Sequence, residues 1–493
     1  MNFAGISNKL FVVGAIIGAL VVAIMLGRAA EAFGEIRLML GLVFLFLVAM
    51  SLSDSKYIIS LAIFLLPLST AQFMPREIMG ITGLNPFNVT LVLGATLILF
   101  RYLINSHTLR MPSPSRAFWL YLGAMVFATL HGTTHVDDIP EYFKMLQIIS
   151  FDSASGYVGE VLFKPLLVLA TAFLLAIGIR NSRRQNFYLV PLFLSSVLLP
   201  LSVIVDVVRS GEGLSAMVVG GASFSGMHAN ELGLMFNMAL ALALFCLFGQ
   251  RGRAAKWLLI INVAILIFGI LLTFSRGAYL GFLVVLTYFL YRRGSFRMMF
   301  LAFLLVPLAI LLTPLAVFER AATGVGSGDV DAISAGRVDE IWRPLLPDIA
   351  SSIVLGRGLS SVLWSEPARS NDFFMSGRIG HPHSAYLGLV LDFGIVGALI
   401  VLGFFLHLWK LFQSLASLHP VPIWRDFFQG AGACVLVLLV QGVTDDRFTP
   451  TVEQCYLWLA YGLALGFVTR YRRRNPGRMI STPLGPAQRN QSP

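Results

Sequence analysis

Residues 231–293 read ELGLMFNMALALALFCLFGQRGRAAKWLLIINVAILIFGILLTFSRGAYLGFLVVLTYFLYRR. This stretch holds three apolar runs, at 231–249, 256–273 and 278–292, separated by a basic turn and by the short turn Thr273–Gly277. A helix needs roughly 20 apolar residues to cross the hydrocarbon core of a bilayer. A backbone in hydrocarbon must also satisfy its own hydrogen bonds, so each run is predicted to be a membrane helix.

The whole chain has the composition of this stretch. Of its 493 residues, 57% are hydrophobic and 12% are charged, whereas a soluble domain has about 25% charged residues. Such a chain has too few charges to cover a water-exposed surface, which excludes a soluble enzyme, a disordered chain and a secreted disulfide scaffold. The three cysteines, Cys246, Cys434 and Cys455, lie in or beside apolar runs without metal-ligand spacing. They are interpreted as small core residues.

The predicted fold class is therefore an all-α polytopic membrane protein with about 12–14 transmembrane helices. Fourteen apolar runs are long enough to be considered: 10–27, 36–53, 57–72, 88–104, 117–131, 161–180, 187–207, 231–249, 256–273, 278–292, 298–317, 384–409, 427–443 and 454–470. The first run is longer than a typical signal-peptide core of about 7–15 residues. It is therefore expected to be an uncleaved first helix.

If all fourteen runs cross the membrane, the loops and termini fall on two sides, and charge is distributed unequally between these sides. The segments on the side of the termini hold 22 basic residues and two acidic ones, Asp54 and Asp426. Basic loops stay in the cytoplasm, so both termini are predicted to be cytoplasmic. The other side carries most of the acidic residues and is predicted to be periplasmic.

Four parts of the chain follow from this topology. Residues 1–317 are expected to form transmembrane helices 1–11 with short cytoplasmic loops, and residues 318–383 a large periplasmic loop. Residues 384–470 are expected to form helices 12–14, followed by a basic cytoplasmic tail at 471–493. Within the large loop, apolar residues at helical spacing predict an amphipathic helix over Arg337–Ile353.

The stretch His381-Pro-His-Ser-Ala-Tyr386 ends the large loop where the next membrane helix begins. Ser384 is a suitable cap for that helix. The positive end of a helix dipole disfavours an imidazolium ion, and a neutral imidazole near pH 7 can act as a general base. The alternative is a structural histidine at the membrane interface that bonds a loop carbonyl.

Arginines form a second group of candidates. Arg276 lies in the turn Thr273–Ala278, and the large loop contains several arginines but no lysine. The planar guanidinium suits phosphate oxygens, so these residues are candidates for binding a phosphorylated ligand. The alternatives are that Arg276 extends to lipid headgroups and that loop arginines pair with nearby acids.

Asn230 ends a Gly- and Ser-rich stretch at 220–230 and could contact a polar ligand or simply cap the next helix. Apart from the pair His381 and His383, no cluster has zinc-ligand spacing, and no metal site is predicted.

The motifs resemble one family. His383-Ser384, nine further residues and Gly394-Ile-Val-Gly397 are similar to the histidine motif of the bacterial O-antigen ligase and polysaccharide polymerase superfamily. Accompanying landmarks follow that superfamily's order: Phe224…Asn230, Ser275-Arg276-Gly277, Gly336-Arg337…Trp342 and Leu355-Gly356-Arg357-Gly358. The resemblance covers roughly residues 215–400.

This resemblance implies a glycosyltransferase-C-like membrane architecture and a reaction on the periplasmic side of the bacterial inner (cytoplasmic) membrane. Members transfer a glycan from a polyprenyl (undecaprenyl) diphosphate to an acceptor sugar hydroxyl, in lipopolysaccharide or exopolysaccharide biosynthesis. No cofactor or metal is expected. The implied partners are the lipid-linked donor, a glycan or lipid A-core acceptor, membrane lipids and other polysaccharide assembly or chain-length proteins, but no nucleic acid.

Such a reaction assigns roles to the candidate residues. His383 is predicted to be the base that takes the proton of the acceptor hydroxyl. Arg276 and Arg337 are predicted to bind the diphosphate, with Arg378, Arg343 and Arg357 as further candidates. Ser275, Asn230, His381 and Tyr386 are other candidates for substrate binding. Direct displacement by one acceptor predicts inversion at the transferred carbon.

Three functions remain open at this level. A polymerase is favoured over a ligase for lipid A-core because the chain is longer than expected for a typical ligase. A lipid-linked oligosaccharide flippase is the rival of another class, since flippases also have many membrane helices. A transporter is expected to keep ionisable groups near the bilayer midplane and to be built of repeats, whereas the candidate residues here cluster at one face.

Overall fold

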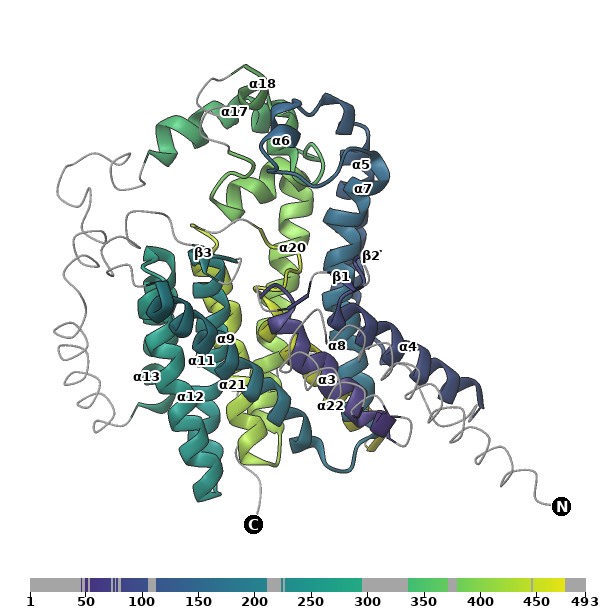
Figure 1. Cartoon of the computed structure of the whole chain (residues 1–493), viewed down its shortest axis with the longest axis vertical. Helices are drawn as coiled ribbons and strands as arrows, with labels where there is room; N and C mark the ends of the chain where they lie inside the picture. Colours follow the sequence, from purple (N-terminus) through teal and green to yellow (C-terminus); the bar gives the residue numbers. More distant parts are fainter. Residues whose placement is uncertain are drawn as a thin grey trace, which may run out of the picture.

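The computed structural model describes residues 46, 49–51, 54–71, 74–75, 77–78, 81–104, 112–210, 223–224, 227–294, 336–370, 379–444 and 447–474. Its longer helices are α3 (Lys56–Leu68), α4 (Pro86–Ile104), α5 (Arg116–Thr133), α8 (Lys164–Asn181), α9 (Leu189–Ser210), α11 (Ala229–Gly249), α12 (Arg253–Leu272), α13 (Arg276–Arg293), α20 (Ala385–Leu418), α21 (Pro422–Gln441) and α22 (Cys455–Arg474) (Figure 1).

Shorter elements connect these helices. They are α6 (Tyr142–Met145), α7 (Ala154–Val158), α17 (Arg343–Ser351), α18 (Glu366–Ser370), the 3-10 turns η1 (Val136–Asp138), η3 (Gln185–Tyr188) and η5 (Ser361–Trp364), and the π-helical turns η2 (Gly159–Phe163) and η4 (Val338–Trp342). Two antiparallel hairpins pair β1 (Glu77–Ile78) with β2 (Ile81–Thr82) and β3 (Ser223–Phe224) with β4 (Met227–His228).

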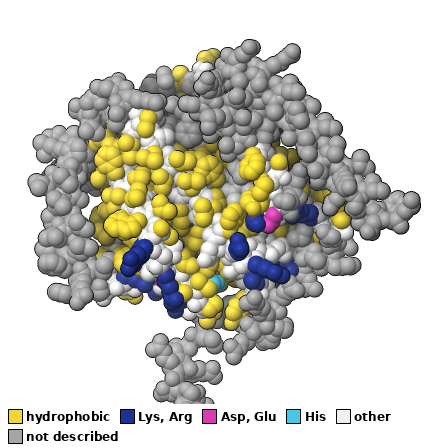
Figure 2. Space-filling model, turned by 60° about the horizontal axis from the view of Figure 1, so that its bottom comes forward, with side chains coloured by type: hydrophobic (Ala, Val, Ile, Leu, Met, Phe, Trp, Pro, Cys, Tyr) yellow, Lys and Arg dark blue, Asp and Glu magenta, His cyan; other side chains and the backbone are white. Residues whose placement is uncertain are grey.

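The protein is an all-α polytopic membrane protein, as predicted. Seven helical stretches of the described chain are long and apolar enough to cross a membrane: α4, the continuous stretch Ala154–Asn181, Gln185–Val205, α11, α12, α20 and α21. Large apolar side chains such as Leu103, Leu120 and Leu258 are exposed on these or neighbouring helices. Figure 2 shows an apolar surface with Lys and Arg gathered along one edge. An apolar surface of this kind is suited to lipid rather than water.

Eleven of the fourteen predicted runs overlap a helix, from 57–72 (α3) to 454–470 (α22). The runs 10–27 and 298–317, and nearly all of 36–53, lie outside the described residues. Of the predicted basic tail at 471–493, residues 471–474 continue helix α22, and the rest lies outside the described residues. The predicted amphipathic helix of the large loop is present as η4 and α17, with Ile341, Leu345 and Ile349 buried.

The centre of the bundle is α11, which is buried on nearly all sides and packs against α21, α12 and α13. Glycines allow the close approach: a Cβ on Gly233 would overlap that of Ala278, and a Cβ on Gly430 would lie 2.7 Å from the carbonyl oxygen of Ala241. The Asn237 side-chain amide donates to the Ala278 carbonyl at 2.8 Å. Small residues and interhelical polar contacts hold membrane helices together, because apolar burial gives little drive within lipid.

At one end of the bundle, polar contacts of basic and aromatic side chains join the ends of neighbouring helices. Arg293 at the end of α13 forms an ion pair with Asp426 at the start of α21. The Trp424 indole donates to the Asn186 side chain at 2.9 Å, and Arg470 at the end of α22 donates to the Ser182 carbonyl at 2.7 Å. These contacts bring the ends of four helices together at this basic end.

Beyond the opposite end lies a cap, which we define as residues 136–158 and 336–370 (η1, α6, α7, η4, α17, η5 and α18) and which occupies the top of Figure 1. Its two chain segments are joined by tyrosine hydroxyls. Tyr142 donates to the Ala368 carbonyl at 3.1 Å, and Tyr157 donates to the Leu359 carbonyl at 2.6 Å. The Leu359 amide donates in turn to the Ala128 carbonyl of α5 at 3.1 Å.

Helix α20 is not the single continuous helix that the run 384–409 predicts, because its backbone breaks at Gly394 (φ +64°). In an unbroken helix Tyr386 and Phe405 would be about 28 Å apart. Their ring centroids instead lie 5.1 Å and 5.8 Å from that of Phe448. The two halves, 385–393 and 395–418, therefore fold back toward each other.

The cap supplies the hydrogen bonds that this break removes from the helix. The amides of Arg357 and Gly358 donate to the carbonyls of Leu391 and Asp392 at 2.8 Å and 3.0 Å. The amide of Ile395 donates to the Ile353 carbonyl at 2.7 Å. Buried backbone groups must be paired, so segment 353–358 and the break at Gly394 form one structural unit.

Candidate active site

His383 lies where the cap, α20 and the end of α21 meet. Ser384 caps α20 by accepting from the Leu387 amide at 3.5 Å, and the Ala385 amide donates to the Gly442 carbonyl at 2.8 Å. The rings of His381 and His383 are edge-to-face, with centroids 4.0 Å apart. Both side chains are partly exposed, so the imidazoles lie at an accessible junction between cap and bundle.

Backbone strain is concentrated at this junction. Four non-glycine residues of the described chain have a positive φ, and three of them are Phe274 (+49°), Ser360 (+63°) and His383 (+49°). Phe274 directly precedes the Ser275–Arg276 turn, and Ser360 borders a cavity beside His381. Left-handed backbone at non-glycine residues costs of order 1–3 kcal/mol each and clusters at functional sites. The strain therefore marks this junction as a candidate site.

The turn that carries Arg276 is held close to the same junction. Ser275 caps α13 by accepting from the Ala278 amide at 3.1 Å, and its hydroxyl donates to the Asn230 side-chain oxygen at 2.5 Å. The Asn230 amide group donates to the Thr444 carbonyl at 3.4 Å. Thr444 is two residues from Gly442, whose carbonyl accepts the hydrogen bond from the Ala385 amide. The segment 442–444 therefore contacts both Asn230, the partner of the turn that carries Arg276, and the start of α20 next to His383.

The segment that begins with Arg337 is linked to the junction through η4. Arg337 directly precedes this turn, and Trp342 at the end of the turn donates from its indole Nε1 to the Pro382 carbonyl at 3.0 Å. Pro382 separates the two histidines. The segments of Arg276, Arg337 and His383, which are far apart in the sequence, therefore converge on one region of the fold.

The structure places the other predicted arginines differently. Arg343 is exposed and forms an ion pair with Asp339 at 2.5 Å, one helical turn away. Arg357 is largely buried in an ion pair with Asp348 inside the cap. Both charges are thus already compensated by carboxylates. Arg378 lies outside the described residues.

Tyr386 and Asn230 have structural partners. The Tyr386 hydroxyl donates to the Leu439 carbonyl of α21 at 2.6 Å, and its ring packs against Phe448. Asn230 joins α11 to Ser275 and Thr444, as described above. These residues tie the helices that bear the site to one another.

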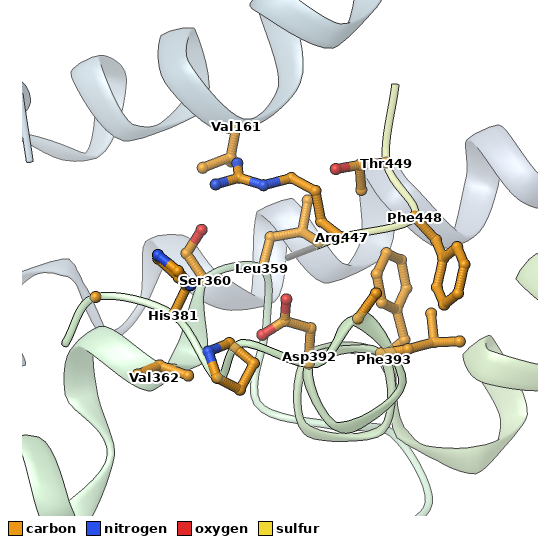
Figure 3. Close-up of a pocket in the computed structure, with 15 residues that line it drawn as sticks. Val161, Leu359, Ser360, Val362, His381, Asp392, Phe393, Arg447, Phe448 and Thr449 are labelled. Carbon is orange, nitrogen blue, oxygen red and sulfur yellow. The ribbon is translucent and has the colours of Figure 1, made fainter. Parts of the chain in front are cut away.

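A cavity of about 50 Å³ lies beside His381 (Figure 3). Its polar lining consists of Ser360 and His381 from the cap side, Asp392 from α20, and Arg447 and Thr449 from the segment between α21 and α22. Apolar lining comes from residues such as Val161, Leu359 and Phe393. Polar groups from three distant segments thus converge, together with apolar side chains, on one small cavity beside the histidine stretch.

Arg447 and Asp392 are site residues that sequence reasoning missed. Arg447 directly follows Asp445 and Asp446 in the last loop, where it resembles an ordinary solvated charge. Asp392 is an ionisable residue inside an apolar run, which is an unusual and informative position. Its Oδ1 accepts from the amide and hydroxyl of Ser361 at 3.0 Å and 2.6 Å.

In the part of the chain that the structure describes, no group of three or more His, Cys, Asp or Glu side chains has the geometry of a metal site. Cys246, Cys434 and Cys455 are free and buried, as expected for core residues.

The fold defines a class: a multi-pass membrane protein with a cap at one end of the bundle, where segments that carry candidate histidine and arginine residues converge. Residues 261–402 match the family model described as O-antigen ligase, so this part of the chain is similar to that family. The match confirms most of the predicted resemblance and spans Arg276, Arg337, His383 and the Gly394 break. No curated protein sequence matches the chain. The protein is thus a membrane enzyme of the glycan ligase or polymerase type.

Proposed function

We propose that this protein transfers a glycan from a polyprenyl diphosphate to the hydroxyl of an acceptor sugar at the membrane surface bearing the cap. The observation that carries the proposal is the convergence of the His383, Arg276 and Arg337 segments at the junction of cap and bundle. A diphosphate donor needs cations, its lipid needs an apolar surface, and the acceptor hydroxyl needs a base. The junction offers all three.

In the proposed reaction His383 accepts the proton of the acceptor hydroxyl. A sugar hydroxyl is far less acidic than imidazolium, so the proton leaves as the new C–O bond forms at the anomeric carbon. The bond from that carbon to the diphosphate oxygen breaks, and the polyprenyl diphosphate departs with the electron pair. General base catalysis contributes about 10²–10⁴-fold to such a step.

Arg276 and Arg337 stabilise the negative charge that grows on the departing diphosphate. Arg378 remains a further candidate, whereas Arg343 and Arg357 are weaker ones because each already has a carboxylate partner. Single displacement by the acceptor oxygen inverts the anomeric configuration. The cap limits entry of water, which would otherwise compete as an acceptor.

The charge asymmetry of the sequence supports a periplasmic location for the cap and cytoplasmic termini. The basic end, fastened by Arg293 and Arg470, would then face the cytoplasm, in keeping with the excess of Lys and Arg in cytoplasmic loops. We place the protein in the bacterial inner membrane on this basis, with a lipid-linked glycan as donor.

Reconstitution tests the proposed reaction. The purified protein is placed in liposomes with carrier-linked glycan extracted from the source membrane, and new glycosidic bonds are sought by mass spectrometry. Product formation with inverted linkage supports the proposal. Movement of the lipid-linked glycan across the bilayer without new bonds would identify a flippase instead.

The length of the chain makes a polymerase our leading assignment. The alternative is a ligase that uses lipid A-core, which the description of the matching family as O-antigen ligase favours. Glycan analysis of a deletion strain distinguishes them. Loss of a polymerase leaves single repeat units on the final acceptor. Loss of a ligase leaves long chains on the carrier lipid.

A further inference from the structure

We propose that the cavity between His381, Asp392 and Arg447 is the subsite that binds the acceptor sugar. This inference rests on the proposed transferase function and deepens it, because it assigns the hydroxyl-bearing substrate to a particular hollow. The cavity borders His381 and Pro382, which directly precede His383. An acceptor bound there would present a hydroxyl next to the proposed base.

The chemistry of the lining favours a neutral polyhydroxyl ligand over an anion. The carboxylate of Asp392 faces the cavity in Figure 3 and offsets the positive charge of Arg447 in the same lining, so the pair offers a diphosphate no net positive charge. The amide and hydroxyl of Ser361 donate to Oδ1 of Asp392, and the Ser360 amide also donates to this carboxylate. A carboxylate has about four acceptor sites, so it can accept from a ligand hydroxyl as well. The hydroxyls of Ser360 and Thr449 can each donate or accept, as sugar recognition requires.

Arg447 supplies the complementary donors. Its side chain is exposed and extends over the cavity from the side opposite Asp392 in Figure 3. None of the ion pairs among the described residues involves its guanidinium, which interacts with Asp392 only at longer range. A guanidinium and a carboxylate across one gap can bind the two hydroxyls of a vicinal diol, one accepting and the other donating.

The size of the cavity fits the edge of a sugar ring. One water-sized group occupies about 10–15 Å³ on this measure, so a cavity of about 50 Å³ holds roughly four such groups. That number corresponds to two ring carbons with their hydroxyls rather than to a whole oligosaccharide. The strained backbone of Ser360, at φ +63°, is consistent with a preorganised subsite.

Direct binding measurements test the subsite without depending on turnover. The ligand is the oligosaccharide released by mild acid from the carrier lipid of the source membrane, which represents the acceptor in the leading polymerase assignment, and inorganic diphosphate is the second probe. Both are titrated calorimetrically into the full-length protein in detergent, for the wild type, Arg447→Ala and Asp392→Asn. Arg369→Ala is the matched control, because Arg369 is another exposed cap-side arginine, 3.5 Å from Asp138 and away from the cavity.

The expected result is at least a tenfold loss of oligosaccharide affinity in Arg447→Ala and Asp392→Asn, with diphosphate affinity within twofold of the wild type. Arg369→Ala should bind both probes normally. A loss of diphosphate affinity with oligosaccharide binding unchanged would overturn the proposal and assign Arg447 to the donor. Unchanged binding of both probes, or no oligosaccharide binding to the wild type, would also overturn it.

The reconstitution assay tests the proposed function separately from the binding measurements. If the reconstituted wild type forms no glycosidic bond, the transferase assignment fails whatever the binding data show. If transfer proceeds but the cavity variants bind the oligosaccharide normally, only the subsite assignment fails. Arg447 is exposed, so its variant tests the proposal even if Asp392→Asn folds poorly.

Discussion

The indole Nε1 of Trp342 donates a hydrogen bond to the Pro382 carbonyl, 3.0 Å away, and so joins η4 to the peptide between the two histidines. Through this bond the segment that begins with Arg337 is fastened to the loop that positions His383. The left-handed backbone of His383 (φ +49°) is maintained by such surrounding contacts.

Removing this bond should disturb the site more than the fold. Trp342→Phe keeps an aromatic side chain but loses the donor, and one hydrogen bond contributes about 1 kcal/mol. We expect glycan transfer to fall by roughly five- to tenfold, with the melting temperature nearly unchanged. Trp257→Phe, at an exposed position on α12, is the control. Equal activity of both variants would remove the positioning role of Trp342.

His383→Ala should abolish the proposed base. Transfer is expected to fall by about 10²–10⁴-fold, the usual contribution of a general base, while the protein keeps its elution profile and helix content. His407→Gln, in the membrane half of α20, serves as the control and should retain transfer. Near wild-type turnover by the His383→Ala protein would contradict the assignment.

Arg276→Ala should weaken use of the donor. Hydrogen bonds to charged groups contribute about 1.5–3 kcal/mol, so the KM for the lipid-linked donor should rise by roughly 10–100-fold. Arg276→Lys should recover part of this loss because it restores the charge without the planar fork. Arg253→Ala, exposed at the start of α12 near the basic end, is the control. A donor KM equal to that of the wild type would exclude Arg276 from diphosphate binding.

Gly394→Ala should destabilise the protein strongly. Gly394 has φ +64°, and a Cβ there would overlap the carbonyl of Val354 in the cap. The loss of fit also releases the hydrogen bonds between segment 353–358 and α20. Unfolding is expected at least 10 °C below the wild type in detergent, measured by intrinsic fluorescence. Gly403→Ala in the same helix meets open space and should be neutral or slightly stabilising. Similar melting of both variants would refute this account of the break.

Much of the membrane fold could be predicted from local sequence. Apolar runs identified helices because a lipid-embedded backbone has no other way to satisfy its hydrogen bonds. The spacing from His383 to Gly394 and Gly397 also indicated the resemblance that the match at 261–402 supports. In contrast, the break at Gly394 could not be predicted, since glycine is common in continuous membrane helices.

The candidate site could be predicted only in part from the sequence. The sequence indicated Arg276, Arg337 and His383 as candidates, and the structure brings their segments together. Arg343 and Arg357 had equal standing in the sequence, because partners at Asp339 and Asp348 become evident only when the chain folds. Arg447 was missed because nothing in its immediate neighbours indicates that it lies over Asp392.

The sequence by itself determined that this is an all-α protein of the membrane and which family its residues 261–402 resemble, since both depend on composition and on short-range spacing. Only the tertiary structure decided that the cap restores the hydrogen bonds lost at Gly394 and that His381, Asp392 and Arg447 share one cavity. Those relations depend on backbone groups and charges that are distant along the chain, and they acquire partners only when the cap packs on the helical bundle.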